Sequence, residues 1–230
     1  MAGWRPPCRF IAPLVAVAVM MMAGPASSVT NNRDRMEARV LAALNYVRVN
    51  PQGYVDGLRA YRNGFKRMRV QMPGSRIFYV TREGTRPVDQ ALRFLSKEAP
   101  RSKLRASPLL AAAAADHAAE QSQSGRVGHF SHNGFSPADR IARRGGGRIV
   151  SEVIVYGAFD APDVVRQLIV DDGVPDRGHR SAMFATKLRY AGVACDRHPT
   201  FRTMCVIEMA ETPDGSRTSA AATRMTPRAS

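Results

Sequence analysis

Residues 107–141 read SPLLAAAAADHAAEQSQSGRVGHFSHNGFSPADRI, and this stretch combines two helix starts with a polar loop. Ser107, followed by proline, is typical of a helix N-cap, and Gly125 is typical of a helix end. The sequence SPAD, which begins at Ser136, repeats the start signal with a carboxylate three residues after the cap. Three of the five histidines of the chain lie in this stretch. A polar loop held between two capped helices is a common way to present binding residues.

Other helices are predicted by the same signals. Apolar residues at helical spacing indicate a first helix that begins near Arg33 and is stopped by Pro51. RPVDQALRFLSKEAP (residues 86–100) has helical spacing, and DAPDVVRQLIVDDG (residues 160–173) begins with a capping aspartate. The basic stretch 59–86 is interpreted as a long connection, in which only RIFYVT is typical of a strand.

A hairpin is predicted near the C-terminus. YAGVACDRHPTFRTMCVIEMAE (residues 190–211) contains two strand-like segments around a turn near Pro199. Cys195 and Cys205 stand symmetrically about this turn, so a bridge across the hairpin is geometrically reasonable. Two buried free thiols are the alternative. A metal site at these cysteines is not expected, because the chain has no second cysteine pair.

The two ends of the chain are set apart from one central domain. Residues 1–28 have the layout of a secretory signal peptide: arginines, the apolar run 10–24 and then small residues. This run has 15 residues, fewer than the roughly 20 needed to span a bilayer as a helix, so a retained anchor is the less favoured alternative. We therefore expect a secreted or periplasmic protein without a transmembrane segment in its mature chain. Residues 33–211 are expected to form the domain, and residues 212–230 a disordered basic tail.

The charge of the chain predicts anionic neighbours. The formal net charge is +15, and loss of Arg5 and Arg9 with the signal peptide lowers it by two to +13. Lipid head groups and cell-wall polymers fit such a surface. Nucleic acid is not expected as a partner, because the basic residues are dispersed and no nucleic-acid motif accompanies them.

Several motifs together resemble a known family. LNYVRVNP, the stretch 107–141, SEVIVYG, VVRQLIVDDGVPDRGHRSAMF and YAGVAC occur in the order found in the CAP superfamily. This superfamily is also called SCP, or cysteine-rich secretory, antigen 5 and pathogenesis-related-1 proteins, and the chain is most similar to its exported bacterial branch. The resemblance implies an α/β fold, namely a single-domain three-layer α-β-α sandwich with an antiparallel sheet.

The resemblance also implies a central cleft lined by two histidines and two acids. His129 is the first histidine, because HFSHNG is similar to the family pattern H-x-S-x-x-G, and His179 in GHR is the second. Glu152 is the first acid, although SEV stands where the family has G-E-N. Asp171 is the second acid, with its neighbour Asp172 as the alternative.

These four residues predict a weak divalent-metal or small-ligand site. His129 and His179 are the expected metal ligands, with Zn²⁺ as the candidate ion, since two neutral imidazoles can share it and leave positions for water. Glu152 and Asp171 would orient the imidazoles. The remaining histidines are interpreted otherwise: His117 as a packed or surface residue, and His132 and His198 as exposed. The glycines of RRGGGR (residues 143–148) are interpreted as a turn rather than a phosphate loop.

Three functions follow from this pattern. A secreted, non-enzymatic interaction protein is favoured, with a lipid in a separate groove as a further ligand that the family resemblance implies. The second is a hydrolase, with either Glu152 as the base for a metal-activated water or Ser131 as a nucleophile; no H-E-x-x-H or G-x-S-x-G motif supports it. The third is a cationic protein that adheres to the anionic cell envelope.

Overall fold

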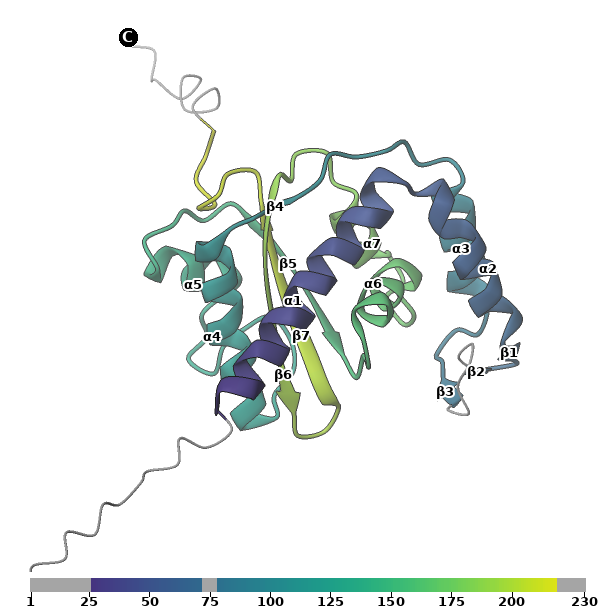
Figure 1. Cartoon of the computed structure of the whole chain (residues 1–230), viewed down its shortest axis with the longest axis horizontal. Helices are drawn as coiled ribbons and strands as arrows, with labels where there is room; N and C mark the ends of the chain where they lie inside the picture. Colours follow the sequence, from purple (N-terminus) through teal and green to yellow (C-terminus); the bar gives the residue numbers. More distant parts are fainter. Residues whose placement is uncertain (1–25, 72–77, 219–230) are drawn as a thin grey trace, which may run out of the picture.

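A four-stranded sheet separates two layers of helices in the computed structural model, which describes residues 26–71 and 78–218 (Figure 1). The strand order is β4-β6-β7-β5. The strands are β4 (Arg105–Ala106), β6 (Tyr190–His198), β7 (Arg202–Ala210) and β5 (Val150–Tyr156). The three long strands are antiparallel, and the two-residue β4 pairs with β6 in parallel. The predicted α-β-α sandwich is confirmed.

Helices α4 (Pro108–Ser124) and α5 (Pro137–Arg143) form one outer layer. The Ser107 hydroxyl accepts a hydrogen bond from the backbone of Leu110, and Gly125 ends α4 with a φ of +68°. Ser136 and Asp139 form a reciprocal capping box at the start of α5. Both helix starts were predicted from their caps, and both are confirmed.

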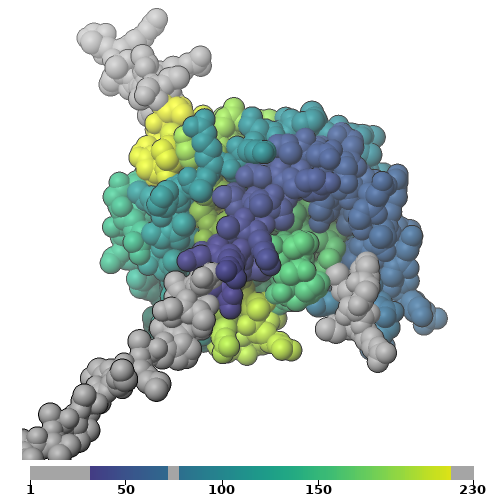
Figure 2. All heavy atoms as spheres, viewed as in Figure 1, coloured from purple at the N-terminus to yellow at the C-terminus, as the bar shows by residue number. Residues whose placement is uncertain are grey.

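The other layer packs against the opposite face of the sheet, where the larger part of the hydrophobic core lies. Its helices are α1 (Ala26–Val49), α2 (Val55–Asn63), α3 (Arg86–Leu95), α6 (Ala161–Val170) and α7 (Gly178–Met183). Helix α1 crosses the front of the molecule in Figure 2, and a short 3-10 helix, Gln52–Tyr54, connects it to α2. Strand residues alternate between the two layers, as the period of two requires.

The interpretation of residues 59–86 as one long connection is wrong. Helix α2 occupies the first part, with Val55, Leu58 and Tyr61 buried on one face. Strands β1 (Phe65–Lys66), β2 (Arg69–Gln71) and β3 (Phe78–Val80) then form a small antiparallel sheet. The helix was missed because Asp56 and Gly57, two residues of low helix propensity, lie between its first two buried positions.

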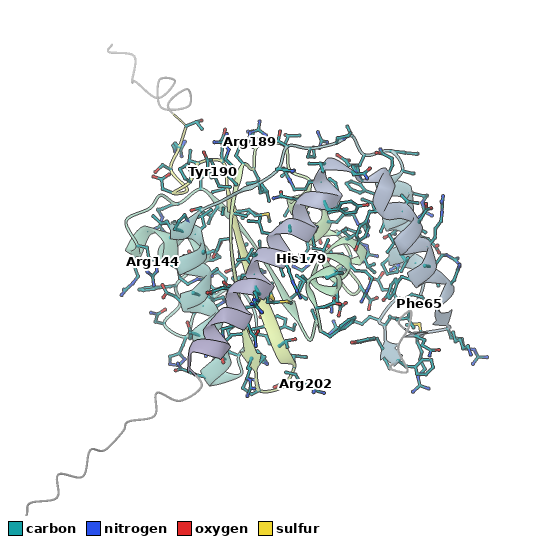
Figure 3. All side chains as sticks on the ribbon, in the orientation of Figure 1. Phe65, Arg144, His179, Arg189, Tyr190 and Arg202 are labelled. Atoms are coloured by element: carbon teal, nitrogen blue, oxygen red, sulfur yellow. A yellow bond between two sulfur atoms is a disulfide. The ribbon has the colours of Figure 1, made fainter. Side chains whose placement is uncertain are left out.

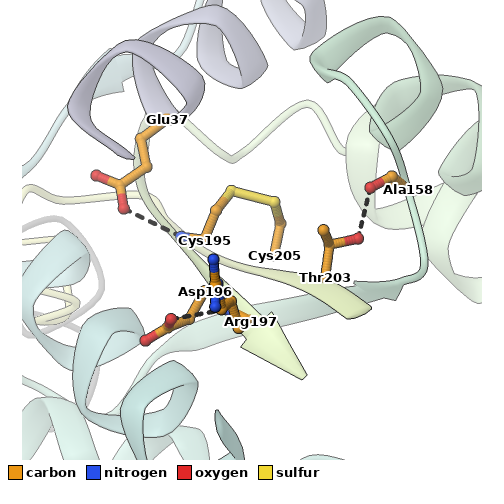
Figure 4. Close-up of a disulfide and its surroundings, with 7 residues drawn as sticks. All are labelled: Glu37, Ala158, Cys195, Asp196, Arg197, Thr203 and Cys205. Carbon is orange, nitrogen blue, oxygen red and sulfur yellow. Dashed lines mark hydrogen bonds between the residues drawn. A yellow bond between two sulfur atoms is a disulfide. The ribbon is translucent and has the colours of Figure 1, made fainter. Parts of the chain in front are cut away.

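The C-terminal hairpin and its disulfide are confirmed (Figure 4). Cys195 and Cys205 are direct cross-strand partners with Cα atoms 4.1 Å apart. The backbone N–H of Cys195 donates to Glu37, so α1 is attached at the same point. The expectation of an exposed His198 is wrong, because its ring is 2% exposed and packs against Tyr156 and Phe201.

Expectations for the chain ends are tested only in part. Residues 212–216 are packed, contrary to the prediction of a disordered tail, because the backbone N–H groups of Gly147 and Ile149 donate to the carbonyls of Asp214 and Gly215. Residues 1–25 of the predicted signal peptide lie outside the described residues, and so do residues 219–230. Within the described ranges, no helix has both the length and the apolar character needed to cross a bilayer.

Gly192 of β6 lets α4 lie directly on the sheet. A Cβ atom at this position would lie 1.9 Å from the backbone nitrogen of Ala111 and 2.2 Å from the carbonyl carbon of Leu110. These are main-chain atoms of α4, so no side-chain rotation can relieve the contact. The absence of a side chain at residue 192 therefore sets the distance between the helix and the strand.

We expect Gly192→Ala to lower the free energy of unfolding by roughly 1–3 kcal/mol, because α4 must move away from the sheet. Urea unfolding followed by circular dichroism would measure this loss. Gly57→Ala is the matched control: residue 57 is an exposed position in α2 with no atom within 4 Å of the added Cβ. This control should gain about 0.5–1 kcal/mol. Equal effects of the two substitutions would contradict the assignment.

Candidate functional site

The first predicted pair, His129 and Glu152, is in contact. The Nδ1 atom of His129 lies 2.7 Å from a carboxylate oxygen of Glu152. Only 1% of the Glu152 side chain is exposed, against 46% for His129, so a buried acid orients an accessible ring. Glu152 lies inside strand β5. A position in the sheet fixes the acid more firmly than a loop would.

Arg140 of α5 attaches the histidine loop to this strand. Its Nη2 donates to Glu152, and its Nη1 donates to the carbonyls of His129 (3.0 Å) and Phe135 (3.2 Å) and to the Ser131 hydroxyl (3.3 Å). The Arg140 side chain is 4% exposed. The buried guanidinium therefore satisfies the loop backbone and the site carboxylate together.

The beginning of the loop is held by a second network around Gly128. The Gly128 N–H donates to the Tyr156 hydroxyl, which in turn donates to Gln121. The Gly128 carbonyl lies 2.8 Å from Nε2 of His117 and 2.6 Å from the Gln121 amide nitrogen. His117 is packed in this network, and burial lowers its pKa. It supports the loop and does not face a ligand.

Glu208 is a buried acid that sequence reasoning missed. It is the direct cross-strand partner of Glu152 and is completely buried. Neither of its carboxylate oxygens has a hydrogen-bond partner among the described residues, and Arg140 Nη2 lies 3.5 Å away. Burial, together with the negative charge of Glu152, raises the pKa of Glu208 to about 9. Burial and the neighbouring carboxylate therefore favour the neutral form of Glu208.

Glu152, in contrast, is ionised. Burial opposes its charge, but the hydrogen bond from His129 and the positive charge of Arg140 outweigh burial, so its pKa lies below the usual value. The pKa values of the two neighbouring acids thus shift in opposite directions, because both acids face Arg140 and each other in one buried space.

The second predicted pair, His179 and Asp171, is also in contact. Asp171 ends helix α6 in a left-handed conformation, with a φ of +60°. Its carboxylate lies 2.7 Å from Nδ1 of His179 and accepts hydrogen bonds from the backbone N–H groups of His179 and Arg180, at the start of α7. Asp172 contacts other groups, the N–H groups of Arg82 and Glu83. Of the two candidates, Asp171 is therefore the one that contacts the histidine.

A cavity of about 540 Å³ lies beside the second pair. His179 and Asp171 line it, together with residues 154–157 around the end of β5 and residues 79–82 of the small sheet. His129 and Glu152 do not line it, although Glu152 is only two residues before the lining residue Ile154. Figure 3 shows His179 near the middle of the molecule.

The two pairs do not form a ready-made metal cage. In the described part of the chain, no three His, Cys, Asp or Glu side chains lie close enough together to hold one metal ion. Each imidazole does present a ligand atom, because an Nδ1–H bonded to a carboxylate leaves the lone pair on Nε2. Nε2 of each ring is therefore the atom with which His129 or His179 would bind a zinc ion.

Comparison with known proteins decides the family. Residues 41–209 match the model of the cysteine-rich secretory protein family, CAP. The chain belongs to this family. The CAP match includes all four predicted site residues and most of the sheet.

Two solved structures are similar to parts of this CAP protein. One is an extracellular protein with an SCP domain from Bacillus anthracis str. Ames, with 16% identity and a TM-score of 0.42 over 49% of this chain and 35% of the other. The second is an outer surface protein from Borrelia burgdorferi, with 18% identity and a TM-score of 0.40 over 50% of this chain and 78% of the other. This chain thus spans about a third of the Bacillus protein. A search of curated proteins finds no match.

The CAP motifs identified the histidines and their acids, but not the residues that support them. Glu208 had one visible signal, a single acid in the apolar strand MCVIEMA. Arg140 had none, because arginine is abundant in this chain. Ser131, the nucleophile of the hydrolase alternative, is 6% exposed and is bonded to Arg140.

We expect Glu208→Gln to make the protein less sensitive to alkaline pH. The pKa of Glu208 is higher in the folded state than in the unfolded state. The contribution of its neutral carboxyl group to the free energy of unfolding is therefore fully present below about pH 4.5 and is lost as the pH rises towards about 9. Each unit by which folding raises the pKa corresponds to about 1.4 kcal/mol of the free energy of unfolding, which is lost when the carboxyl group ionises.

Urea unfolding between pH 5 and pH 9 tests this expectation. The stability of the glutamine variant relative to the wild type should grow steadily over this range. A constant difference across the range would show that Glu208 does not titrate as described.

Proposed function

We propose that this CAP protein is an exported, non-enzymatic interaction protein in which His129 and His179 bind a divalent metal ion weakly, with zinc as the best-suited ion. The observation that carries the proposal is the similar geometry of the two histidine–acid pairs. In each pair a histidine Nδ1 lies 2.7 Å from a carboxylate that is only 1% exposed.

This arrangement supports metal binding through its chemistry. A carboxylate that accepts from Nδ1–H fixes the tautomer, orients the ring and makes Nε2 a better ligand. Hydrogen bonds to the backbone of α7 hold Asp171, and Arg140 holds Glu152. The two rings are therefore oriented before any ion arrives.

Two imidazoles alone would bind zinc loosely. Structural zinc sites have four protein ligands and catalytic sites usually have three. A zinc ion bound by His129 and His179 would act as a Lewis acid towards water or a polar ligand at its open positions. Occupancy should therefore depend on the supply of metal.

The overall charge of the chain supports an interaction role. The formal net charge is +15, or +13 without Arg5 and Arg9 of the predicted signal peptide, and it favours an anionic cell-envelope surface. Binding of a lipid or another small ligand in a separate groove stays a prediction. Among the described residues, the Ser131 hydroxyl is hydrogen-bonded to Arg140 and to no histidine, so its contacts do not favour the hydrolase alternative.

Isothermal titration with zinc tests the proposal. The wild type should take up zinc weakly, and the double variant His129→Ala/His179→Ala should lose this uptake. His132→Ala is the matched control, because His132 is an exposed histidine of the same loop whose Nδ1 contacts Arg126. Uptake that persists unchanged in the double variant would refute the assignment of these two histidines.

Asp171→Asn separates orientation from ligation. Asparagine tolerates the left-handed conformation of residue 171 and keeps its size, but it is a poorer partner for Nδ1–H. We expect zinc affinity to fall by about 10–100-fold, with an unchanged circular dichroism spectrum. An unchanged affinity would mean that the carboxylate does not support the metal ligand.

A further inference from the structure

We propose that the outer face of the small sheet β1-β2-β3 docks the exported protein on an anionic lipid bilayer, with apolar side chains at the acyl boundary and basic side chains at the lipid phosphates. The proposal names a surface for the envelope interaction described above and rests on export of the protein, but it does not depend on zinc binding. The docking surface consists of four residues of the outer face and two of the β1–β2 turn: Lys66, Arg69, Phe78, Val80, Arg67 and Met68.

The strand register places basic and apolar residues on the same face of this sheet. Lys66 is the direct partner of Arg69, and Arg69 is the direct partner of Val80. Directly opposite residues of antiparallel strands point to the same side. Phe78 lies two residues before Val80 and therefore shares this side as well. The inner face packs against the hydrophobic core with the alternate residues Phe65, Val70 and Tyr79.

Apolar side chains are exposed on the docking surface. The exposed fractions are 74% for Val80, 47% for Phe78 and 42% for Met68. Val80 also borders the cavity beside the second histidine–acid pair, whereas the other five residues of the docking surface do not line it. Figure 1 shows the small sheet at the end of the molecule away from α4 and α5. A bilayer takes up such side chains at its acyl boundary, whereas a hydrophilic wall polymer offers them no apolar partner.

The basic residues of the docking surface are not neutralised by the protein. Residues 57–82 contain seven Lys or Arg and no Asp or Glu. Two of the seven, Arg59 and Arg62, are paired with carboxylates of α2 and α3. Within the described part of the chain, no ion pair is formed by the exposed residues Lys66, Arg67 and Arg69. Anionic lipid head groups would supply the missing negative charge.

Two acids lie near the point where the chain leaves β3, and both already accept hydrogen bonds from the protein. Asp172 accepts from the backbone N–H groups of Arg82 and Glu83. The carboxylate of Glu83 is paired with Arg177 and Arg86. Even when both acids are counted, four basic side chains of the docking surface and its border stand against them: Lys66, Arg67, Arg69 and Arg82. The local charge is therefore positive, as an anionic bilayer requires.

Co-sedimentation of the exported protein with lipid vesicles tests the partner. The wild type should bind vesicles of phosphatidylcholine that contain about 30% phosphatidylglycerol, and it should bind pure phosphatidylcholine at least about tenfold more weakly. Equal binding to both kinds of vesicle, or no binding to the anionic ones, would overturn the proposal. Binding to soluble polyphosphate but not to anionic vesicles would identify an anionic polymer as the partner and would also overturn it.

A pair of double charge reversals tests the position of the docking surface. Lys66→Glu/Arg69→Glu should weaken binding to the anionic vesicles by at least about tenfold, with an unchanged circular dichroism spectrum. Lys97→Glu/Lys103→Glu is the matched control, because it changes the net charge equally at exposed positions outside the small sheet. At about 0.15 M salt, where distant charges are screened, the control should lose no more than about threefold. Equal losses would mean that only the overall charge matters and would refute the docking surface.

Tryptophan fluorescence tests whether the apolar side chains enter the bilayer. The only tryptophan of the chain is Trp4, in the predicted signal peptide, so Phe78→Trp gives the exported protein a single reporter. Its emission should shift to shorter wavelength on vesicle binding and should be quenched by brominated acyl chains. Ile149→Trp is the matched control, since Ile149 is 46% exposed and lies outside the small sheet. Vesicle binding without a shift at residue 78, or with equal shifts at both positions, would exclude insertion of the outer face.

Zinc titration separates this proposal from the metal proposal. Zinc uptake should be unchanged in Lys66→Glu/Arg69→Glu, because neither residue contacts a histidine–acid pair. Vesicle binding should be unchanged in His129→Ala/His179→Ala. Loss of vesicle binding in the histidine variant would show that the bilayer contacts the histidines instead of the small sheet, and would overturn the docking surface.

Discussion

The buried guanidinium of Arg140 is the constraint on which the candidate site depends. A charge with 4% exposure is tolerated only where carboxylates and carbonyls compensate it. Here the compensation comes from Glu152 and from the backbone of the histidine loop, so that one side chain connects α5, the loop and β5. The position of His129 follows from this connection, because its ring is bonded to the same carboxylate that neutralises Arg140. The raised pKa of Glu208 follows as well, since burial and the negative charge of Glu152 both oppose a second negative charge beside this one guanidinium.

The two histidines are oriented by different structural means. Glu152 is fixed by a strand and by a buried arginine, whereas Asp171 is fixed by the end of α6 and by backbone N–H groups at the start of α7. The chemical result is similar, a ring whose Nδ1 is bonded to a buried carboxylate and whose Nε2 is available. An imidazole oriented in this way loses little conformational freedom when it binds a ligand. This shared chemistry, on two unrelated local structures, is a stronger indication of a binding role than either histidine alone.

Strand β5 connects the first histidine–acid pair to the cavity beside the second pair. Its first half carries Glu152, and residues 154–157 at its end line the cavity that also contains His179. The small sheet contributes to the other side of that cavity, and of its three strands only β3, within the strand-like RIFYVT, had a clear signal in the sequence. Edge strands are normally protected against pairing with other chains. Within the described residues of this CAP protein, β5 pairs with a strand on one side only, and the end of the strand borders a cavity.

The sequence by itself determined the features that depend on neighbouring residues. The caps at Ser107 and Ser136, the hairpin and the pairing of Cys195 with Cys205 could be predicted because each is a local interaction within a short segment. The family motifs indicated four candidate residues, and the structure brings these together as two histidine–acid pairs. Only the tertiary structure decided which acid contacts His179, why His198 is buried, and that Glu208 shares a buried space with Glu152. Those outcomes depend on strand register and on packing between segments far apart in the chain, and the residue types alone contain no record of either.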